Sequence, residues 1–221
     1  MTDPLVTGTV SGTPGAEVLL FGPGDRPVLL AAGLTDAAGA FALEPSANDL
    51  PDTATLLVKL KGDPVGVLAR AVKLPRPVHL ELVPSVAFAL RIGIESDSGS
   101  PDELVLALEP VRPEGVPERL WPFINQRGPG VFDGRFLTRT ISEPESSVSL
   151  LPGIWTVGAE FLDHNRPNMT EPDFHNYVTA SARSEPDGAP LRGSEHGGFE
   201  IEVGDDRRVT LRLREVDDEE L

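Results

Sequence analysis

The sequence predicts an all-β chain made of two tandem antiparallel β-sandwich domains of the Greek-key, prealbumin or immunoglobulin-like kind. The first observation is a hydrophobic period of two, as in Val86–Glu95, where apolar residues take every second position. The second is the turn signals between short apolar runs, as at Gly22–Asp25 and Asp97–Pro101. The third is composition: 22 Gly and 22 Pro among 221 residues leave no long helical stripe. Short helical turns are expected only within Ala47–Leu50 and Pro117–Leu120.

The first predicted domain covers residues 1–84 and contains seven strands, each bounded by turn residues or proline. They are expected near Leu5–Val10, Ala16–Phe21, Val28–Leu34, Ala40–Glu44, Ala54–Leu60, Val65–Leu74 and Val78–Val83.

The second predicted domain covers residues 85–216, with an acidic, solubilising tail at 217–221. Its strands are expected near Val86–Glu95, Glu103–Leu108, Phe132–Ile141, Ser147–Leu150, Ile154–Leu162, Tyr177–Ala182, Phe199–Val203 and Arg207–Glu215. Three loops separate them: Glu109–Val131, Asp163–Asn176 and Ser184–Gly197. Loops of this length within a compact domain are usually functional or mobile.

Three segments of the first domain carry a family pattern: Val6-Thr7-Gly8-Thr9-Val10, Ala16-Glu17-Val18-Leu19-Leu20, and the hairpin from Thr35 to Leu43. In the hairpin, Asp36 is expected to cap the turn, Gly39 to take a positive φ, and Phe41 to enter the core. The pattern resembles the carboxypeptidase regulatory-like domains of the transthyretin-like or Cna-B-like sandwiches, over about residues 5–83. The turn and strand from Leu151 to Val157 resemble the same superfamily. The resemblance implies a spacer, stabiliser or binding module attached to something else.

Composition excludes several classes of partner and chemistry. The chain has no cysteine, so disulfides, zinc–thiolate sites and thiol nucleophiles are excluded. A net charge of −16 disfavours nucleic acid and anionic membranes as partners. We expect no cofactor. The start at Met1–Pro4 has no basic or apolar signal region, so a bacterial cytoplasmic location is expected, or export with an assembly.

Histidines in the predicted loops leave a metal site open as an alternative. His164, Asp173, His175 and His196 could together bind a divalent metal, because imidazole and carboxylate groups are common ligands. Their spacing matches no known site, and solvated loop residues are the simpler interpretation. His79 alternates with apolar neighbours and is expected to face water.

Two lysines leave a covalent isopeptide cross-link open as a further possibility. Cna-B-like domains often carry a lysine–asparagine isopeptide bond, and this resemblance makes Lys59 and Lys61 conceivable donors with an aspartate acceptor. The first strand has no lysine and the last has no asparagine, so surface lysines on a strand are the simpler expectation.

The most distinctive segment is Arg119–Phe132, which concentrates aromatic, aliphatic and arginine residues in a predicted loop. Such residue types often anchor interfaces. The candidate partner-binding residues are Leu120, Trp121, Phe123, Ile124 and Arg127. The alternative is that the segment folds onto its own sandwich or fills the seam between domains.

No catalytic set is recognisable, so the sequence predicts a non-enzymatic structural or protein-interaction module of a larger bacterial assembly. It would dock onto a protein partner, or onto copies of itself, through second-domain loops or sheet edges. One alternative is a carbohydrate- or peptide-binding module, although Trp155 shares a core-facing register with Val157, Ala159 and Phe161. The other is a metal-dependent enzyme using the loop histidines.

Overall fold

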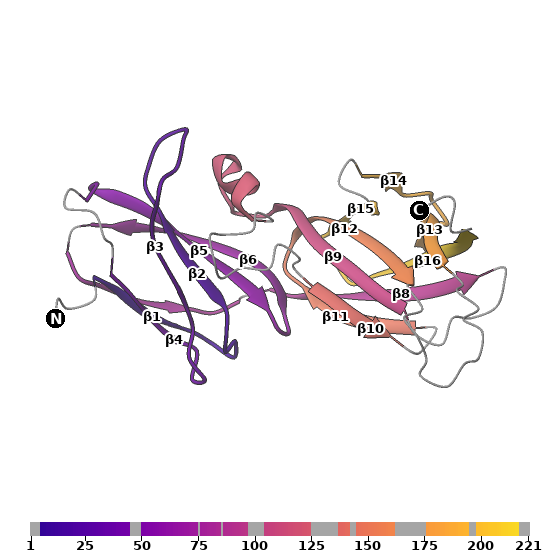
Figure 1. Ribbon diagram of the computed structural model, residues 1–221, viewed down its shortest axis with the longest axis horizontal. Helices are drawn as coiled ribbons and strands as arrows, with labels where there is room; N and C mark the ends of the chain where they lie inside the picture. Colours follow the sequence, from indigo (N-terminus) through magenta and orange to yellow (C-terminus); the bar gives the residue numbers. More distant parts are fainter. Residues whose placement is uncertain are drawn as a thin grey trace, which may run out of the picture. The chain divides into compact units, whose positions relative to one another are not determined.

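The computed structural model describes residues 5–44, 50–74, 76–84, 86–96, 104–124, 137–141, 145–161, 176–194 and 198–216 (Figure 1). Nearly all of this is strand, so the predicted all-β class is confirmed. The chain forms two compact units. Unit 1 comprises Met1–Ala87, Pro110–Gly134 and Ser149–Gly153, and unit 2 comprises Phe88–Glu109, Arg135–Val148 and Ile154–Leu221. Within the described ranges, no helix is long and apolar enough to cross a membrane.

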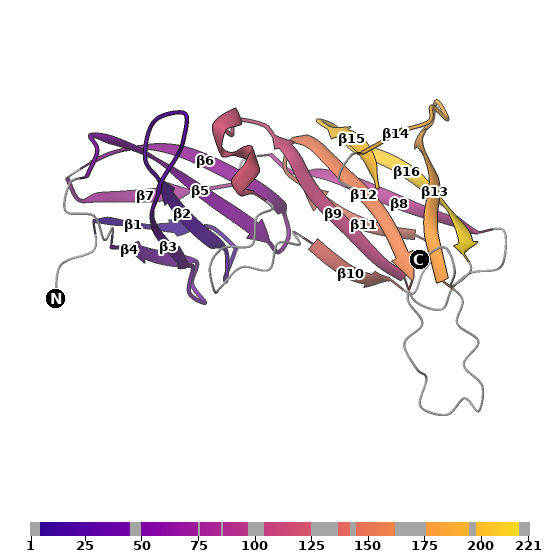
Figure 2. The ribbon, with the colours of Figure 1, turned by 45° about the horizontal axis from the view of Figure 1, so that its top comes forward.

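Unit 1 is a sandwich of two sheets. The smaller sheet has the order β4-β1-β7, and the larger has the order β6-β5-β2-β3, with the end of β11 beside β6 (Figures 1 and 2). The strands are β1 (Val6–Val10), β2 (Glu17–Phe21), β3 (Leu29–Leu34), β4 (Ala40–Leu43), β5 (Thr53–Lys61), β6 (Val65–Lys73), β7 (Val78–Leu82) and β11 (Glu145–Leu150). All seven strands predicted for the first domain are present, within one or two residues at each end.

The core of unit 1 lies between these two sheets. Alternate residues of the strands supply it, as the period of two requires. Its largest buried members include Leu20, Phe41, Leu43, Leu56 and Leu60. Strands β2 and β5 differ from the expected pattern, because both of their faces are buried. A second layer must therefore cover their outer face.

The hairpin between β3 and β4 has the predicted turn chemistry. Asp36 Oδ1 accepts hydrogen bonds from the N–H groups of Ala38, at 2.8 Å, and Ala40, at 2.9 Å. Gly39 has a φ of +79°, and Phe41 is buried. The turn also shows what the sequence did not reveal: Thr35 is buried, and its Oγ1 donates to Thr13 O at 2.7 Å.

Unit 2 has the strand order β10-β9-β12-β13-β16-β8-β11, and β15 pairs with both β12 and β14. The strands are β8 (Phe88–Ser96), β9 (Leu104–Pro113), β10 (Leu137–Ile141), β12 (Gly153–Phe161), β13 (Asn176–Glu185), β14 (Arg192–Gly193), β15 (Phe199–Val203) and β16 (Arg207–Val216). Its core contains Trp155, Val157, Ile92 and Leu211, each fully buried. The predicted core-facing register of Trp155 is confirmed.

The unit boundaries differ from the predicted domain boundaries in one respect. The first change of unit, after Ala87, lies three residues from the predicted end at residue 84. Residues 110–134 and 149–153 belong to unit 1, although the sequence assigned them to the second domain. Hydrophobic periodicity reports which face of a strand is buried, but it does not report which sheet buries it.

Two further details differ from the expected pattern. Strand β9 continues to Pro113, although the sequence predicted a loop from Glu109 onward. Pro110 and Pro113 are unfavourable within a strand, so the sequence carries no strand signal there. Its partner β10 pairs only with Leu104–Leu108, so the prolines lie beyond that ladder. In addition, β1 pairs with β7 and β16 pairs with β8 in parallel, so the sheets are mixed.

Gly39→Ala should destabilise unit 1 more than Gly12→Ala. Both glycines have a φ between +70° and +80°, which costs an alanine about 1–2 kcal/mol. A Cβ at Gly39 would also lie 2.3 Å from Val10 O, whereas nothing lies within 4 Å of a Cβ at Gly12. Urea unfolding of both variants measures the difference. Equal losses would contradict the tight turn.

Candidate functional site

Part of the outer face of the larger sheet of unit 1 is covered by the segment that the sequence singled out. A short 3-10 helix, η1 (Glu118–Phe123), follows β9, and it places Leu120 and Ile124 in the interior at 0% and 1% exposure. The ring of Phe123 lies 5.1 Å from the ring of Phe21 on β2. Arg119 donates from Nη2 to Thr55 Oγ1 on β5 at 2.9 Å. η1 therefore covers the outer face of β2 and β5 at their Phe21–Thr55 end.

Trp121 is held against its own segment. Its Nε1 donates to Val116 O at 3.1 Å, and the guanidinium of Arg112 lies 5.8 Å from its ring centroid. A cation over an aromatic face at this distance is attracted by the ring quadrupole. The indole is partly exposed, but both its polar atom and one face already have a partner.

The five predicted partner-binding residues thus have different positions. Leu120 and Ile124 are interior side chains, so they cannot contact another protein in this conformation. Trp121 and Phe123 are partly exposed. Arg127 lies outside the described residues. For Leu120 and Ile124 the structure favours the alternative that the segment folds onto its own sandwich.

A buried ion cluster lies on the same outer face. Glu17 and Lys59 face each other across β2 and β5, with side chains 3% and 4% exposed. Lys59 Nζ lies 3.6 Å from Glu17 Oε2, and Lys61 Nζ lies 2.5 Å from Glu17 Oε1. The first distance is too long for a hydrogen bond, and Glu17 Oε2 receives none from the described residues.

Burial lowers the pKa of the Lys59 ammonium below its ordinary value of 10.5, and the nearby Glu17 carboxylate opposes this shift. Desolvation disfavours the charged form of a buried amine. Both conceivable isopeptide donors, Lys59 and Lys61, thus pair with a glutamate carboxylate, and no described aspartate or asparagine contacts them. The expectation that these are surface lysines is wrong for Lys59.

Strand β3 is the edge of the larger sheet, because among the described residues it pairs only with β2. Its outer side chains lie opposite the covered ones of β2: Leu34 opposite Glu17, Ala32 opposite Leu19, and Leu29 opposite Phe21. Leu29 is 41% exposed, Leu34 is 51% exposed, and the preceding Val28 is 65% exposed. These are three of the five large apolar side chains found exposed in the described residues.

One side of the β3 backbone also has no strand partner among the described residues. Thr35 donates its N–H to Ala16 O at 2.9 Å. Hydrogen-bonding direction alternates along a strand, so Gly33 points toward β2, whereas Ala32 and Leu34 direct their N–H and C=O groups away from it. A bulge at Leu30, between the pairs of Leu20 and Phe21, interrupts this alternation. The regular free edge is therefore Ala31–Leu34.

The exposed side chains of β3 are close to the aromatic segment. Phe123 contacts Phe21, and Phe21 is the strand-pair neighbour of Leu29. Apolar surface therefore extends from η1 across β2 to the edge of the sheet. We call Val28, Leu29, Ala32 and Leu34 the edge surface. The sequence contained its signal, a run from Pro27 to Thr35 without a charge, but not the strand order that makes it an edge.

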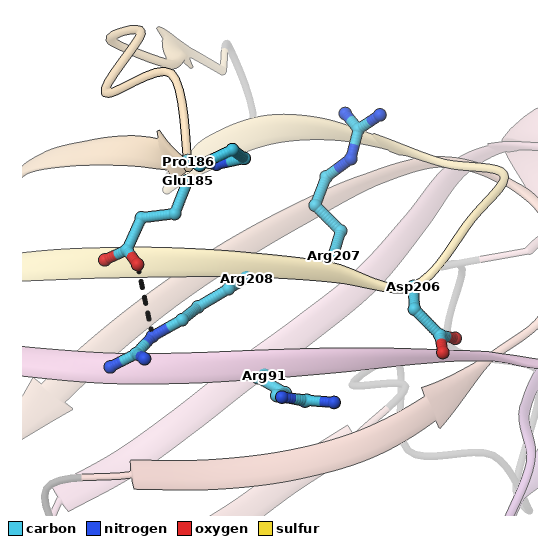
Figure 3. Close-up of a pocket in the computed structure, with 6 residues that line it drawn as sticks. All are labelled: Arg91, Glu185, Pro186, Asp206, Arg207 and Arg208. Atoms are coloured by element: carbon cyan, nitrogen blue, oxygen red, sulfur yellow. Dashed lines mark ion pairs between the residues drawn. The ribbon is translucent and has the colours of Figure 1, made fainter.

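Unit 2 contains a polar hollow of about 320 Å³, formed where the ends of β13, β16 and β8 meet (Figure 3). It is lined by Arg91, Glu185, Pro186, Asp206, Arg207 and Arg208. Arg208 pairs with Glu145 and, at 3.4 Å, with Glu185. Arg207 pairs with Asp205 at 3.3 Å, and Asp206 Oδ1 accepts from Ala89 N. Most of these charges are neutralised locally, so the hollow is not a strong anion site.

The predicted metal ligands cannot be placed. His164, Asp173, His175 and His196 lie outside the described residues, and the described ranges hold no cluster of three or more His, Asp or Glu suited to a metal. His79 is exposed as expected, and its Nδ1 lies 3.1 Å from Thr7 Oγ1.

The tryptophans do not form a sugar-binding platform in this structure. Trp155 has no exposed surface. Trp121 presents only part of its ring, because Arg112 covers one face. Sugar sites usually need an open aromatic face, so no described geometry favours the carbohydrate alternative.

Comparisons with known proteins give only remote similarities. No family model matches, and no curated protein matches. Among solved structures, the Bacillus anthracis TIE protein matches at 10% identity with a TM-score of 0.29, over 96% of this chain and 33% of that one. This chain thus spans a third of that protein. Shaft pilin SpaA from Lactobacillus rhamnosus GG matches at 8% identity and a TM-score of 0.28, over 98% and 99% of the two chains. The major pilin T-13 of Streptococcus pyogenes matches at 11% identity with a TM-score of 0.26, over 97% of each chain. Scores this low carry no conclusion about function.

The buried ammonium of Lys59 should make stability depend on pH. Its pKa is lower in the folded chain than in the unfolded one, so between the two values the unfolded chain binds more protons. Stability therefore rises with pH in that window, by at most about 1.4 kcal/mol per pH unit. The unfolding free energy of the wild type, minus that of Lys59→Met, should increase as the pH approaches 10.5.

The matched control is Lys73→Met, which removes an exposed lysine from the neighbouring strand β6. The difference in unfolding free energy between the wild type and Lys73→Met should stay constant over the same pH range. A flat difference for Lys59→Met as well would show that the Lys59 ammonium is hydrated in the folded state.

Proposed function

We propose that the chain is a non-enzymatic structural or protein-interaction module of a larger assembly, which docks through the edge surface of unit 1. The observation that carries this proposal is an edge strand with exposed Val28, Leu29 and Leu34 and no charge between Pro27 and Thr35. Soluble proteins usually protect such edges with charges, proline or a covering segment.

The contrast with the rest of the chain supports this choice of surface. A quarter of all residues are charged, and the net charge is −16. The nine uncharged residues Pro27–Thr35 leave this sheet edge without the charges that usually protect one. On the outer face of the same sheet, η1 contacts Phe21 and Thr55, beside the edge strand.

Strand addition is the binding mode that this geometry favours. The free N–H and C=O groups of Ala32 and Leu34 can pair with an extended segment of another chain, while Leu29 and Leu34 contact its side chains. Backbone pairing gives affinity with little sequence preference, so exposed side chains determine the partner. A peptide ligand, one of the sequence alternatives, would use the same edge.

A photo-reactive amino acid at Leu34 tests the proposal in cells of the source organism. We expect cross-linked products heavier than the monomer, because a docked strand would lie within a few ångströms of this side chain. The matched control is the same amino acid at Val83, which is 64% exposed and lies after β7, away from β3. Absence of products at Leu34, or equal products at both positions, would refute docking at this edge.

A further inference from the structure

We infer that the strand docking at β3 is supplied by a second copy of this chain, so that two copies pair antiparallel edge to edge with Ala32 of one opposite Ala32 of the other. This inference rests on the proposed function and names its partner. It follows from the charge pattern around the strand, from the two-fold symmetry of such a pairing, and from the exposure of the edge surface.

The charges at the two ends of the strand have opposite signs. Arg26 precedes the uncharged run and Asp36 follows it, so Ala31 lies five residues from each. Arg26 is exposed and forms no ion pair with a described residue. Antiparallel pairing about the middle of the strand brings the Arg26 end of each copy toward the Asp36 end of the other. Parallel pairing would bring like charges together.

A two-fold dimer requires a self-complementary patch, because each surface meets its own copy. The edge surface meets this requirement: small residues, Ala31, Ala32 and Gly33, occupy the centre of the free edge. Leu34 of each copy then lies on the same face as Ala32 of the other and fills the space beside it. The only nearby acid on β2, Glu17, is already paired with two lysines.

The net charge explains why this edge is the place where two copies can meet. Two chains of −16 repel each other at long range, and this repulsion is screened beyond about 8 Å at physiological ionic strength. Close approach then depends on the local charge, which is zero along Pro27–Thr35. The bulge at Leu30 limits the length of regular pairing. The interface is therefore small, and the dimer should be weak and dependent on concentration.

Sedimentation velocity of the full chain over a wide range of concentration tests the inference. The mass should rise from 23.6 kDa toward twice that value. Leu34→Lys places a charge on the edge of each copy and should keep the chain monomeric, with an unchanged circular dichroism spectrum. Val83→Lys, the matched control at an exposed apolar residue away from β3, should dimerise like the wild type.

A disulfide test fixes the position of the contact. The chain has no cysteine, so Ala32→Cys reports only on this site. With Ala32 of one copy opposite Ala32 of the other, the two introduced thiols are close enough to oxidise to a cross-linked dimer. Val83→Cys should remain monomeric under the same oxidant.

Three outcomes would overturn the inference: a monomer at every concentration, a dimer that persists in Leu34→Lys, or equal oxidation of Ala32→Cys and Val83→Cys. The photo-cross-linking experiment separates this failure from that of the proposed function. If Leu34 cross-links to a different protein while the purified chain stays monomeric, docking at β3 stands and the second copy is excluded. If it cross-links to nothing, both fail.

Discussion

The structure of unit 1 depends on the burial of β2 and β5 on both faces. One face is buried in the ordinary way, by the facing sheet of the sandwich. The other is covered at the Phe21–Thr55 end by η1, which lies about sixty residues further along the chain than β5. The contacts of Phe123 with Phe21 and of Arg119 with Thr55 hold η1 on this face. A strand that is buried on both faces of its sheet needs apolar residues at nearly every position, rather than at every second one.

This double cover explains the two unusual features of the unit. The first is the Glu17–Lys59 pair, because charged groups on a face that would otherwise be solvated become buried. A buried ion pair usually gives little net stability, since desolvation offsets the attraction. The second is β3, the strand next to the covered ones, which ends the sheet beyond the reach of the cover and so exposes Leu29 and Leu34.

The fold was largely predictable from the sequence, since it is encoded in local patterns. Short apolar runs bounded by turn residues located the seven strands predicted for the first domain, and the Asp36–Gly39 turn followed from residue chemistry. The strand β14 and the extension of β9 through Pro110 were missed, because two-residue pairings and prolines give no strand signal. The assignment of residues 110–134 to unit 1 was also missed, because it depends on long-range contacts.

The candidate site was only partly predictable. The aromatic composition singled out the η1 segment as a candidate partner surface, but Leu120 and Ile124 are buried within the chain. Residue type does not distinguish an internal anchor from an external one. Likewise, the uncharged run at β3 is visible in the sequence, yet a central strand buried in a sheet would read in the same way. Only the strand order identifies it as an edge.

Amide hydrogen exchange, followed by NMR in dilute solution, tests most directly whether η1 covers the sheet and leaves β3 as its free edge. We expect slow exchange for Leu19 and Leu57, which are buried on the outer face, and slower exchange for Gly33 than for its neighbours Ala32 and Leu34 on the open side. Protection of Ala32 and Leu34 equal to that of Leu19 in the monomer, or rapid exchange of Leu57, would contradict this expectation.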